Sequence, residues 1–302
     1  MVSVRRVALV DVRQNKHYRG DTMNILFWNT NISKGGNVKA AGINNCLLSL
    51  ATENEVDLLI LAEYGENIRQ LCRYLSNLSG TQYIPIPNNG GCTKIKGIIN
   101  GKYNIQTLRE RDRYQMVKIS TVFYDLIVAM IHSDSKRYSR NNRQEEILRQ
   151  FHTAIIEEQE AHNCENVIAI GDYNTNPFEE ACLSAGNLFA VPFVDEVTGN
   201  PTRCIGDRIY QKFYNPTWKF FGNRNIPYTT YHYYNTGDMA NCYWNVIDQV
   251  MIRPKLIEAF DDEKLKIISN TKKHQLLHNG KPDKNNFSDH LPLFCALKEE
   301  MI

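Results

Sequence analysis

Apolar residues in this chain of 302 residues gather in short runs that alternate with segments of helical spacing. Residues 23–29 (MNILFWN) and 57–62 (DLLILA) are continuous apolar runs of the length expected for buried strands. Between them, residues 38–54 place apolar side chains near the helical period, and residues 67–78 do so after the second run. The pattern therefore predicts an opening of the βαβ type followed by another helix.

The pattern continues with strands and one long helix. We expect a helix over residues 142–162, where one apolar stripe is surrounded by charged positions. Strands are expected over residues 95–99, 105–108, 114–120, 123–131, 167–170, 246–252 and 293–297, with 114–120 and 123–131 pairing as a hairpin. Residues 198–245 would form an unusually long connection, rich in aromatic residues, and long connections are commonly functional.

The domain organisation follows from the same pattern. No internal repeat and no linker-like change of composition divides the chain. We therefore expect one domain over residues 23–302, preceded by an N-terminal extension over residues 1–22. Residues 7–12 of that extension could form an edge strand, although the sequence does not decide whether the extension is ordered.

Composition excludes several classes of protein. Lys+Arg 35 against Asp+Glu 33 gives a net charge of +2, and 42% of residues are hydrophobic, so the chain can fold around a core. No apolar run approaches the ~20 residues that span a bilayer, which argues against stable membrane association. The N-terminal apolar run ends at Asp11, too early for a secretory signal. We expect a cytoplasmic protein whose eight cysteines, none spaced as a metal or redox pair, are free thiols.

Polar side chains that can carry chemistry follow the apolar runs. They are Asn29, Glu63, His132, Asp172 with Asn174, and Asp248, and the triplet Ser288-Asp289-His290 precedes the last strand. A single polar residue at a strand end usually caps a turn or meets water. Together, however, they provide carboxylates, amides and imidazoles that could line one cleft.

This set of side chains suits phosphoryl chemistry. Magnesium is held by one or two carboxylates together with phosphate and water oxygens, and histidine exchanges protons near neutral pH. Zinc is less favoured because thiolate and imidazole ligands at short spacing are absent from the sequence.

In these motifs the chain resembles the endonuclease/exonuclease/phosphatase superfamily, to which deoxyribonuclease I belongs. The motifs match in order from Met23 to Leu297, as LFWNTN, LILAEY, IGDYNTNP, VIDQV and FSDHLPL. The resemblance implies an α/β (α+β) fold, a four-layer sandwich of two packed mixed β-sheets flanked by helices. It also implies a site at one rim of the sandwich.

The resemblance further implies a role for each residue. Glu63, with Asn29 and Asp289, would hold magnesium, for which manganese could substitute. Asp172 would position or deprotonate the attacking water, and Asn174 would bind the phosphate or the nucleophile. His290 would donate to a phosphate oxygen or share the role of base, with Asp248 fixing its tautomer.

His132 indicates which subgroup of the superfamily the chain resembles. In HSDSK it resembles the histidine of deoxyribonuclease I and the sphingomyelinases that protonates the leaving oxygen. The alternative is a structural histidine, for which Glu110 is a candidate partner. The sequence also departs from the family: Ala62 stands where many members have glutamine, and Asn245-Val246 stand where arginine often precedes the Asp248 motif.

Nucleic acid, DNA or RNA, is the expected substrate of an intracellular nuclease. Arg113 could contact a phosphate, and Tyr114 and Trp244 could contribute to substrate binding, since aromatic rings stack bases regardless of sequence. The alternative is a phosphatase or phosphodiesterase of a small or lipid phosphoester. A catalytically silent binding module is disfavoured because every motif is intact.

Overall fold

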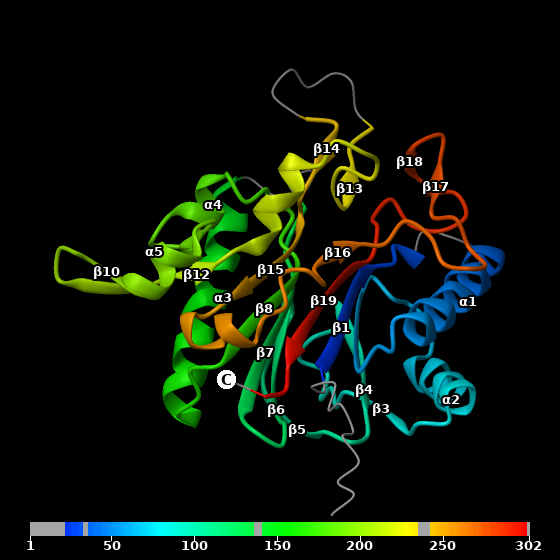
Figure 1. Ribbon diagram of the computed structural model, residues 1–302, viewed down its shortest axis with the longest axis horizontal. Helices are drawn as coiled ribbons and strands as arrows, with labels where there is room; N and C mark the ends of the chain where they lie inside the picture. Colours follow the sequence, from blue (N-terminus) through cyan, green and yellow to red (C-terminus); the bar gives the residue numbers. More distant parts are fainter. Residues whose placement is uncertain (1–21, 33–35, 136–140, 235–241, 301–302) are drawn as a thin grey trace, which may run out of the picture.

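Two large β-sheets form the centre of the protein, and helices cover their outer faces (Figure 1). The computed structural model describes residues 22–32, 36–135, 141–234 and 242–300. The proposed edge strand over residues 7–12 lies outside the described residues. Within them, the predicted strand over residues 23–29 is β1, Thr22–Asn29.

The first sheet has six strands in the described part of the chain, in the order β16-β19-β1-β2-β4-β3. In chain order they are β1, β2 (Leu58–Ala62), β3 (Tyr83–Pro85), β4 (Ile95–Asn100), β16 (Lys266–Ile267) and β19 (Leu293–Lys298). β1 and β2 run parallel, with Asn29 opposite Ala62. The ends of these two strands, which carry Asn29 and Glu63, therefore lie at the same edge of the sheet.

The second sheet has seven described strands in the order β5-β6-β7-β8-β15-β12-β9. In chain order they are β5 (Asn104–Arg111), β6 (Tyr114–Ser120), β7 (Asp125–His132), β8 (Val167–Asp172), β9 (Ala190–Val191), β12 (Phe213–Tyr214) and β15 (Asp248–Ile252). The predicted hairpin between β6 and β7 is confirmed, and β7 and β8 run parallel. Both sheets are therefore mixed, as the motifs implied.

Helices complete four layers. α1 (Asn37–Glu53) and α2 (Ile68–Ser79) pack on the first sheet, and α3 (Asn141–His162) packs on the second (Figure 1). The bounds of α2 follow from its sequence. The Asn67 side chain accepts hydrogen bonds from the backbone N–H groups of Arg69 and Gln70, and Gly80 ends the helix with a left-handed φ of 70°.

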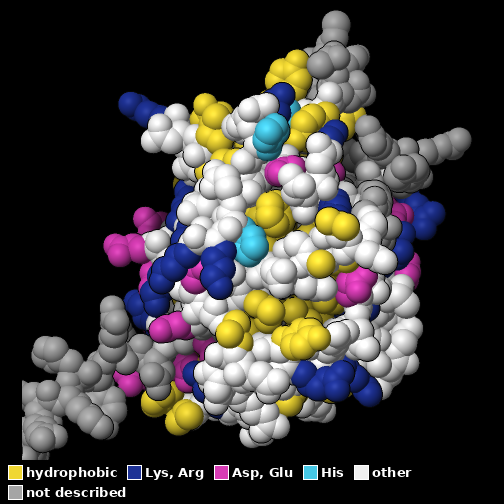
Figure 2. Space-filling view, turned by 90° about the vertical axis from the view of Figure 1, so that its right-hand side faces the viewer, with side chains coloured by type: hydrophobic (Ala, Val, Ile, Leu, Met, Phe, Trp, Pro, Cys, Tyr) yellow, Lys and Arg dark blue, Asp and Glu magenta, His cyan; other side chains and the backbone are white. Residues whose placement is uncertain are grey.

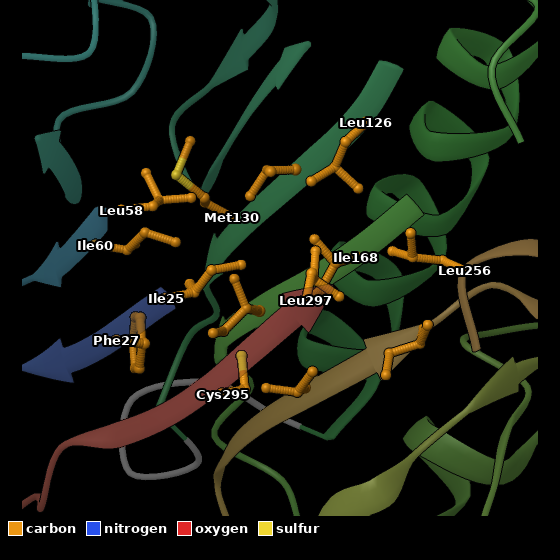
Figure 3. Close-up of a cluster of buried hydrophobic side chains, with 14 of the residues drawn as sticks. Ile25, Phe27, Leu58, Ile60, Leu126, Met130, Ile168, Leu256, Cys295 and Leu297 are labelled. Atoms are coloured by element: carbon orange, nitrogen blue, oxygen red, sulfur yellow. The ribbon is translucent and has the colours of Figure 1, made fainter. Parts of the chain in front are cut away.

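Alternation along the strands produces the core between the sheets. Ile25 and Phe27 of β1 face the second sheet, where they join side chains such as Met130 and Ile168 (Figure 3). Leu26 and Trp28 point the other way, toward α1 and α2. Strands that are buried on both faces explain why these runs are apolar without interruption.

The connections contain short elements that the sequence analysis did not predict. β3 was not predicted, because its three residues carry no clear alternation. Residues 198–245 are not one open connection: short elements divide them. The short elements outside the two large sheets are α4 (Glu180–Leu183), α5 (Val194–Gly199), β10 (Thr202–Ile205), β11 (Arg208–Gln211), η2 (Pro216–Gly222), β13 (Tyr231–His232), β14 (Trp244–Asn245), η3 (Pro254–Ala259), β17 (Leu277–His278) and β18 (Lys281–Pro282).

Two expectations from composition can be compared with the described residues. None of the described helices is long and apolar enough to cross a membrane. All eight cysteines are free thiols; six are buried, and Cys204 and Cys242 are exposed.

Candidate active site

Strand register brings the predicted side chains together at one rim of the sandwich. In the second sheet, His132 at the end of β7 lies opposite Asp172 at the end of β8. Asp172 in turn lies opposite Asp248 at the start of the antiparallel strand β15. Three motifs far apart in the sequence therefore become neighbours across adjacent strands.

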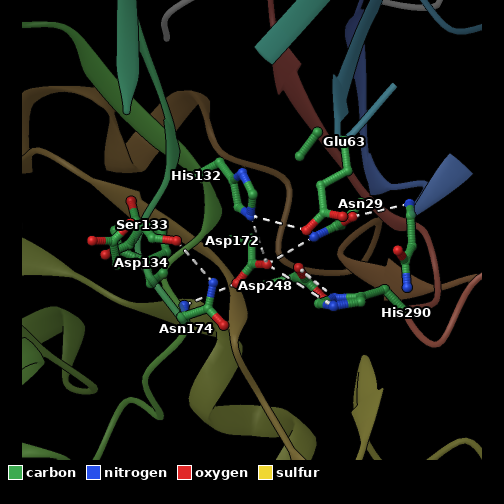
Figure 4. Close-up of polar contacts among 12 residues, drawn as sticks. Asn29, Glu63, His132, Ser133, Asp134, Asp172, Asn174, Asp248 and His290 are labelled. Atoms are coloured by element: carbon green, nitrogen blue, oxygen red, sulfur yellow. Dashed lines mark hydrogen bonds and ion pairs between the residues drawn. The ribbon is translucent and has the colours of Figure 1, made fainter. Parts of the chain in front are cut away.

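These side chains open into a cleft of about 800 Å³ between the two sheets. Asn29 and Glu63 line it from the side of the first sheet, whereas His132 and Asp172 line it from the second (Figure 4). Asp289 is a further lining residue. Asn174 and His290 also line the cleft, and Asp248 lies behind His290. The eight residues predicted for catalysis and metal binding thus converge on one place.

Asp172 lies at the centre of the site and is buried. Its Oδ2 atom accepts a hydrogen bond of 2.9 Å from Nδ2 of Asn29, and its Oδ1 atom accepts one of 2.9 Å from the backbone N–H of Asn174. Burial raises the pKa of Asp172 to about 7; the neighbouring Asp248 acts in the same direction, and His290 opposes it. A carboxylate with a pKa near 7 is suited to accept a proton at neutral pH.

His290 forms a buried pair with Asp248. Nδ1 of His290 lies 2.9 Å and 3.1 Å from the two carboxylate oxygens of Asp248. Burial disfavours the charged ring, but the attraction and hydrogen bonds of Asp248 outweigh it and raise the pKa of His290 to about 10. The ring is therefore an imidazolium at neutral pH, and its Nε2 lies 4.0 Å from Oδ2 of Asp172.

The backbone around His290 is also fixed. Nε1 of Trp28 donates to the carbonyl of His290 at 2.9 Å, and the N–H of His290 donates to Oγ of Ser288 at 3.1 Å. Ser288 in turn donates to the carbonyl of Asn29 at 2.7 Å. These bonds tie the Ser288-Asp289-His290 triplet to the end of β1.

His132 faces two carboxylates. Its Nε2 lies 3.5 Å from Oε1 of Glu63 and 3.8 Å from Oδ2 of Asp172. Burial, followed by the positive charges of His290 and Arg113, lowers the pKa of His132 to about 4. This ring is thus neutral at pH 7, whereas the ring of His290 is charged.

Glu110, the candidate partner for a structural His132, makes other contacts. The carboxylate of Glu110 accepts hydrogen bonds from the backbone N–H groups of Asn89 and Gly91, at distances of 2.9 Å or slightly more. Glu110 therefore holds the segment that contains Asn89 and Gly91. The carboxylates that face His132 are those of Glu63 and Asp172.

Oxygen atoms on the side of the first sheet suit a hard cation. The carboxylates of Glu63 and Asp289 line the cleft there. Asn31 lies between β1 and this rim, donates from Nδ2 to Oδ1 of Asp289 at 2.8 Å, and has a buried Oδ1 atom without a hydrogen-bond partner. An unpartnered buried oxygen beside two carboxylates fits magnesium, which prefers oxygen ligands.

A second group could also hold a metal ion. One ligand atom each from Asp172, Asp248 and His290 lies within 4.8 Å of the others. In this group, however, Nδ1 of His290 is already hydrogen-bonded to Asp248, and the ring is protonated. A cation there would have to displace that proton, so the Glu63 side is the better fit.

A close approach of two strands explains the glycine of the GDYN motif. A Cβ atom at Gly171 would lie 1.9 Å from the carbonyl oxygen of Ile131 on the neighbouring strand β7. Only glycine lets β8 reach this register, which places Asp172 opposite His132.

The residues expected to bind substrate separate into two groups. Arg113 lines the cleft, where its guanidinium pairs with Asp134 and lies 3.1 Å from Asp112. The ring of Tyr114 instead lies in the core beneath α3, packed on Phe151 with a centroid distance of 5.4 Å. Tyr114 was therefore wrongly assigned: it begins β6 and packs under α3, whereas Arg113 lies in the turn before that strand and lines the cleft.

Trp244 was also assigned to substrate binding, and the structure does not bring it to the cleft lining. Its ring packs edge-on against Tyr228 at 5.7 Å and against His232 at 5.1 Å. The next residue, Asn245, lines the cleft instead. Trp244 therefore supports the wall that Asn245 belongs to.

Several lining residues were missed by the sequence analysis: Asn31, Lys94, Asn176, Tyr231 and Tyr233. Asn31 and Asn176 stand two residues beyond Asn29 and Asn174, so alternation within the motifs could have identified them. Tyr231 packs on the ring of His290 at 4.7 Å, a contact between distant segments that leaves no local signal.

Charge is mixed on one face of the molecule. On the face shown in Figure 2, Lys and Arg side chains are interspersed with Asp and Glu. In the cleft itself, Lys94 and Arg113 are lining residues.

Comparison with known proteins gives matches in structure and none in sequence. No protein-family model and no curated protein matches the sequence. The structure, however, matches ANGEL2, described as a 2',3'-cyclic phosphatase, with a TM-score of 0.58 and 14% identity, over 92% of this chain and 95% of that one.

Two further solved structures match over nearly their whole length. An endonuclease/exonuclease/phosphatase family protein from Bacteroides thetaiotaomicron matches with a TM-score of 0.52 and 10% identity, over 94% of this chain and 100% of that one. D. rerio TDP2 complexed with a single-strand DNA product matches with a TM-score of 0.50 and 15% identity, over 91% and 98%. The chain has the fold that its motifs predicted, that of the endonuclease/exonuclease/phosphatase superfamily.

Proposed function

We propose that this protein is a divalent-metal-dependent phosphodiesterase that hydrolyses nucleic acid. The observation that carries the proposal is the convergence of Asn29, Glu63, His132, Asp172 and His290 on one cleft, with Asp248 behind His290. Fold alone does not imply function, so the argument depends on what these side chains can do together.

Asp172 is the proposed general base. Its pKa of about 7 leaves it partly ionised at neutral pH, and its carboxylate is held by Asn29 and by the N–H of Asn174. A carboxylate oriented in this way can take a proton from water as the water attacks phosphorus. Asn174, which lines the cleft beside it, would donate to the phosphate.

The two histidines have different proposed roles: one stabilises charge on the phosphate and the other interacts with the leaving oxygen. His290 is positively charged and lines the cleft, so it would stabilise the negative charge that grows on a non-bridging oxygen. His132 is neutral, and its Nε2 faces two carboxylates, so Nε2 carries the proton and can donate a hydrogen bond to the leaving oxygen. Environments that push two pKa values apart are characteristic of acid and base roles.

Glu63, Asn29 and Asp289 are the proposed magnesium ligands, with Asn31 as an additional oxygen donor. When bound, the ion would neutralise charge on the scissile phosphate. Manganese, which also accepts oxygen ligands, is expected to substitute for it.

Nucleic acid is the proposed substrate because cations flank the site. Lys94 and Arg113 line the same cleft and lie close enough to His132 to lower its pKa. They would contact phosphates next to the scissile one, which position a polynucleotide without reading its sequence. The proposal covers DNA and RNA.

A small phosphoester is the second candidate. One of the matching structures is described as a 2',3'-cyclic phosphatase, and the cleft of about 800 Å³ is large enough to enclose a small ligand. The acid and base roles would be the same for this substrate.

Cleavage assays with magnesium, manganese or EDTA test the proposal. The substrates are labelled linear DNA, circular DNA, single-stranded RNA, a 2',3'-cyclic nucleotide and bis-para-nitrophenyl phosphate, and Asp172→Ala is the matched inactive variant. Metal-dependent cleavage of a polymer that the variant lacks would support the nuclease. Hydrolysis of only the small esters would favour the second candidate. If no substrate is hydrolysed, a catalytically silent binding module would be the remaining hypothesis.

A further inference from the structure

The loop that follows β8 holds both Asp172 and Asn174 in place. Asn174 has a left-handed φ of 53°, which non-glycine residues rarely adopt. In this conformation its backbone N–H points back to Oδ1 of Asp172, and its Nδ2 donates to the carbonyl of Ser133 at 3.0 Å (Figure 4). The orientation of the Asp172 carboxylate therefore depends on the conformation of the loop.

Gln144 of α3 reaches this loop from the outer layer. Its side chain is 3% exposed, and Nε2 lies 2.6 Å from the carbonyl oxygen of Asn174 and 3.2 Å from that of Tyr173. The carbonyl of Asp134, in the neighbouring loop, lies 3.3 Å away. One buried amide therefore joins the two loops that flank the site.

Gln249 of β15 holds the next carbonyl from the other side. It is fully buried, and its Nε2 donates to the carbonyl of Thr175 at 2.6 Å. Its Oε1 accepts from Nδ2 of Asn215 at 2.8 Å, which fixes the orientation of the amide. Because Gln249 follows Asp248 on the strand, it points away from the cleft and contacts the loop from behind.

Two buried glutamines thus place their amide nitrogens within hydrogen-bond distance of three successive carbonyls of one loop. Buried carbonyls need hydrogen-bond partners, and this loop has few backbone partners because it leaves the sheet at Asp172. We propose that Gln144 and Gln249 are positioning residues that hold residues 173–175 in the conformation in which Asn174 orients Asp172. The inference rests on the proposed function, to which it adds the residues that preorganise the base.

Kinetics with bis-para-nitrophenyl phosphate and saturating magnesium test this role. Gln144→Leu and Gln249→Leu should each lower kcat about 10- to 100-fold, because small displacements of a catalytic group have effects of that size. KM and the magnesium midpoint should stay within about twofold, since neither glutamine lines the cleft. Rates are expressed per folded molecule, with the folded fraction taken from circular dichroism.

Gln150→Leu is the matched control. Gln150 lies on the same helix as Gln144 but is exposed, and it donates to Oε1 of Glu146 at 2.8 Å. It should leave kcat unchanged. If Gln144→Leu and Gln249→Leu, corrected for folding, retain kcat within about twofold, the positioning role is wrong.

Amide hydrogen exchange separates this inference from the proposed function. In either glutamine variant, the N–H of Asn174 should exchange at least about tenfold faster, while the amides within β8 keep their rates. Unchanged exchange at Asn174 would overturn the inference whatever the kinetics show. If the wild-type protein hydrolyses no substrate, the proposed function fails, and exchange still decides whether the glutamines hold the loop.

Discussion

Replacing His152 by glutamine should remove part of the pH dependence of this protein's stability. His152 lies in α3, is buried, and has Nε2 3.0 Å from Nη2 of Arg253. A guanidinium only donates hydrogen bonds, so Nε2 must accept and the imidazole must be neutral. Burial, reinforced by the positive charge of Arg253, lowers the pKa of His152 to about 3.

The sign and size of the effect follow from this pKa. An unfolded histidine has a pKa of ~6.5, so below that pH the unfolded state binds a proton that the folded state does not. The contribution of His152 to stability is therefore complete above about pH 6.5 and is lost as the pH falls toward 3. The full difference corresponds to ~5 kcal/mol, of which ~2 kcal/mol is lost between about pH 7.5 and pH 5.

Urea unfolding at several pH values measures the effect. The free energy of unfolding of the wild-type protein should fall by ~2 kcal/mol more than that of His152→Gln between about pH 7.5 and pH 5. Glutamine can still accept a hydrogen bond from Arg253 but does not titrate. Any loss of packing in the variant is the same at every pH, so it would shift the variant's curve of unfolding free energy against pH without changing the slope. Other titrating groups cancel in this comparison.

His278→Gln is the matched control, because His278 is exposed and meets water in both states. It should follow the wild-type curve. Equal slopes for the wild-type protein and His152→Gln would show that His152 accepts a proton in the folded state, and the reasoning from Arg253 would be refuted.

Three further predictions concern the site. Glu63→Gln should raise the magnesium midpoint of hydrolysis about tenfold or more, and an unchanged metal titration would remove Glu63 from the ligand set. Asp248→Asn removes the charged partner of the His290 imidazolium and should lower kcat by about 10²- to 10³-fold. The rate is measured at neutral pH on protein shown to be folded by circular dichroism. Full activity would argue against a charged His290. Gly171→Ala would place a Cβ atom 1.9 Å from the carbonyl oxygen of Ile131. It should therefore lower the free energy of unfolding, measured by urea titration, by about 3 kcal/mol or more. A stability equal to that of the wild-type protein would contradict the strand contact.

Much of the site could be predicted because each motif is local. Asn29 and Asp172 end a strand, Glu63 directly follows one, and Asp248 begins one. The apolar run of each strand is visible in the sequence. Parallel pairing of β1 with β2 and of β7 with β8 then places strand ends at the same edges. The order of the motifs therefore indicated both the fold and the identity of the converging side chains.

The substrate residues could not be predicted equally well, because residues next to each other in the chain can face opposite sides. Tyr114 stands next to Arg113, and Trp244 next to Asn245, yet only Arg113 and Asn245 line the cleft. Charge and aromaticity in a segment do not say which side chain faces the site. That choice depends on the register of the strand and on what covers its other face.

The sequence by itself determined the longer strands and helices, and the carboxylates, amides and imidazoles that follow the strands, because apolar periodicity and motif chemistry are properties of neighbouring residues. Only the tertiary structure decided the protonation of the two histidines. The distances of His290 from Asp248, and of His132 from Glu63 and Asp172, arise from packing two sheets against each other. Proton affinity depends on burial and on charges within a few ångströms, and these are set by contacts between residues far apart in the chain.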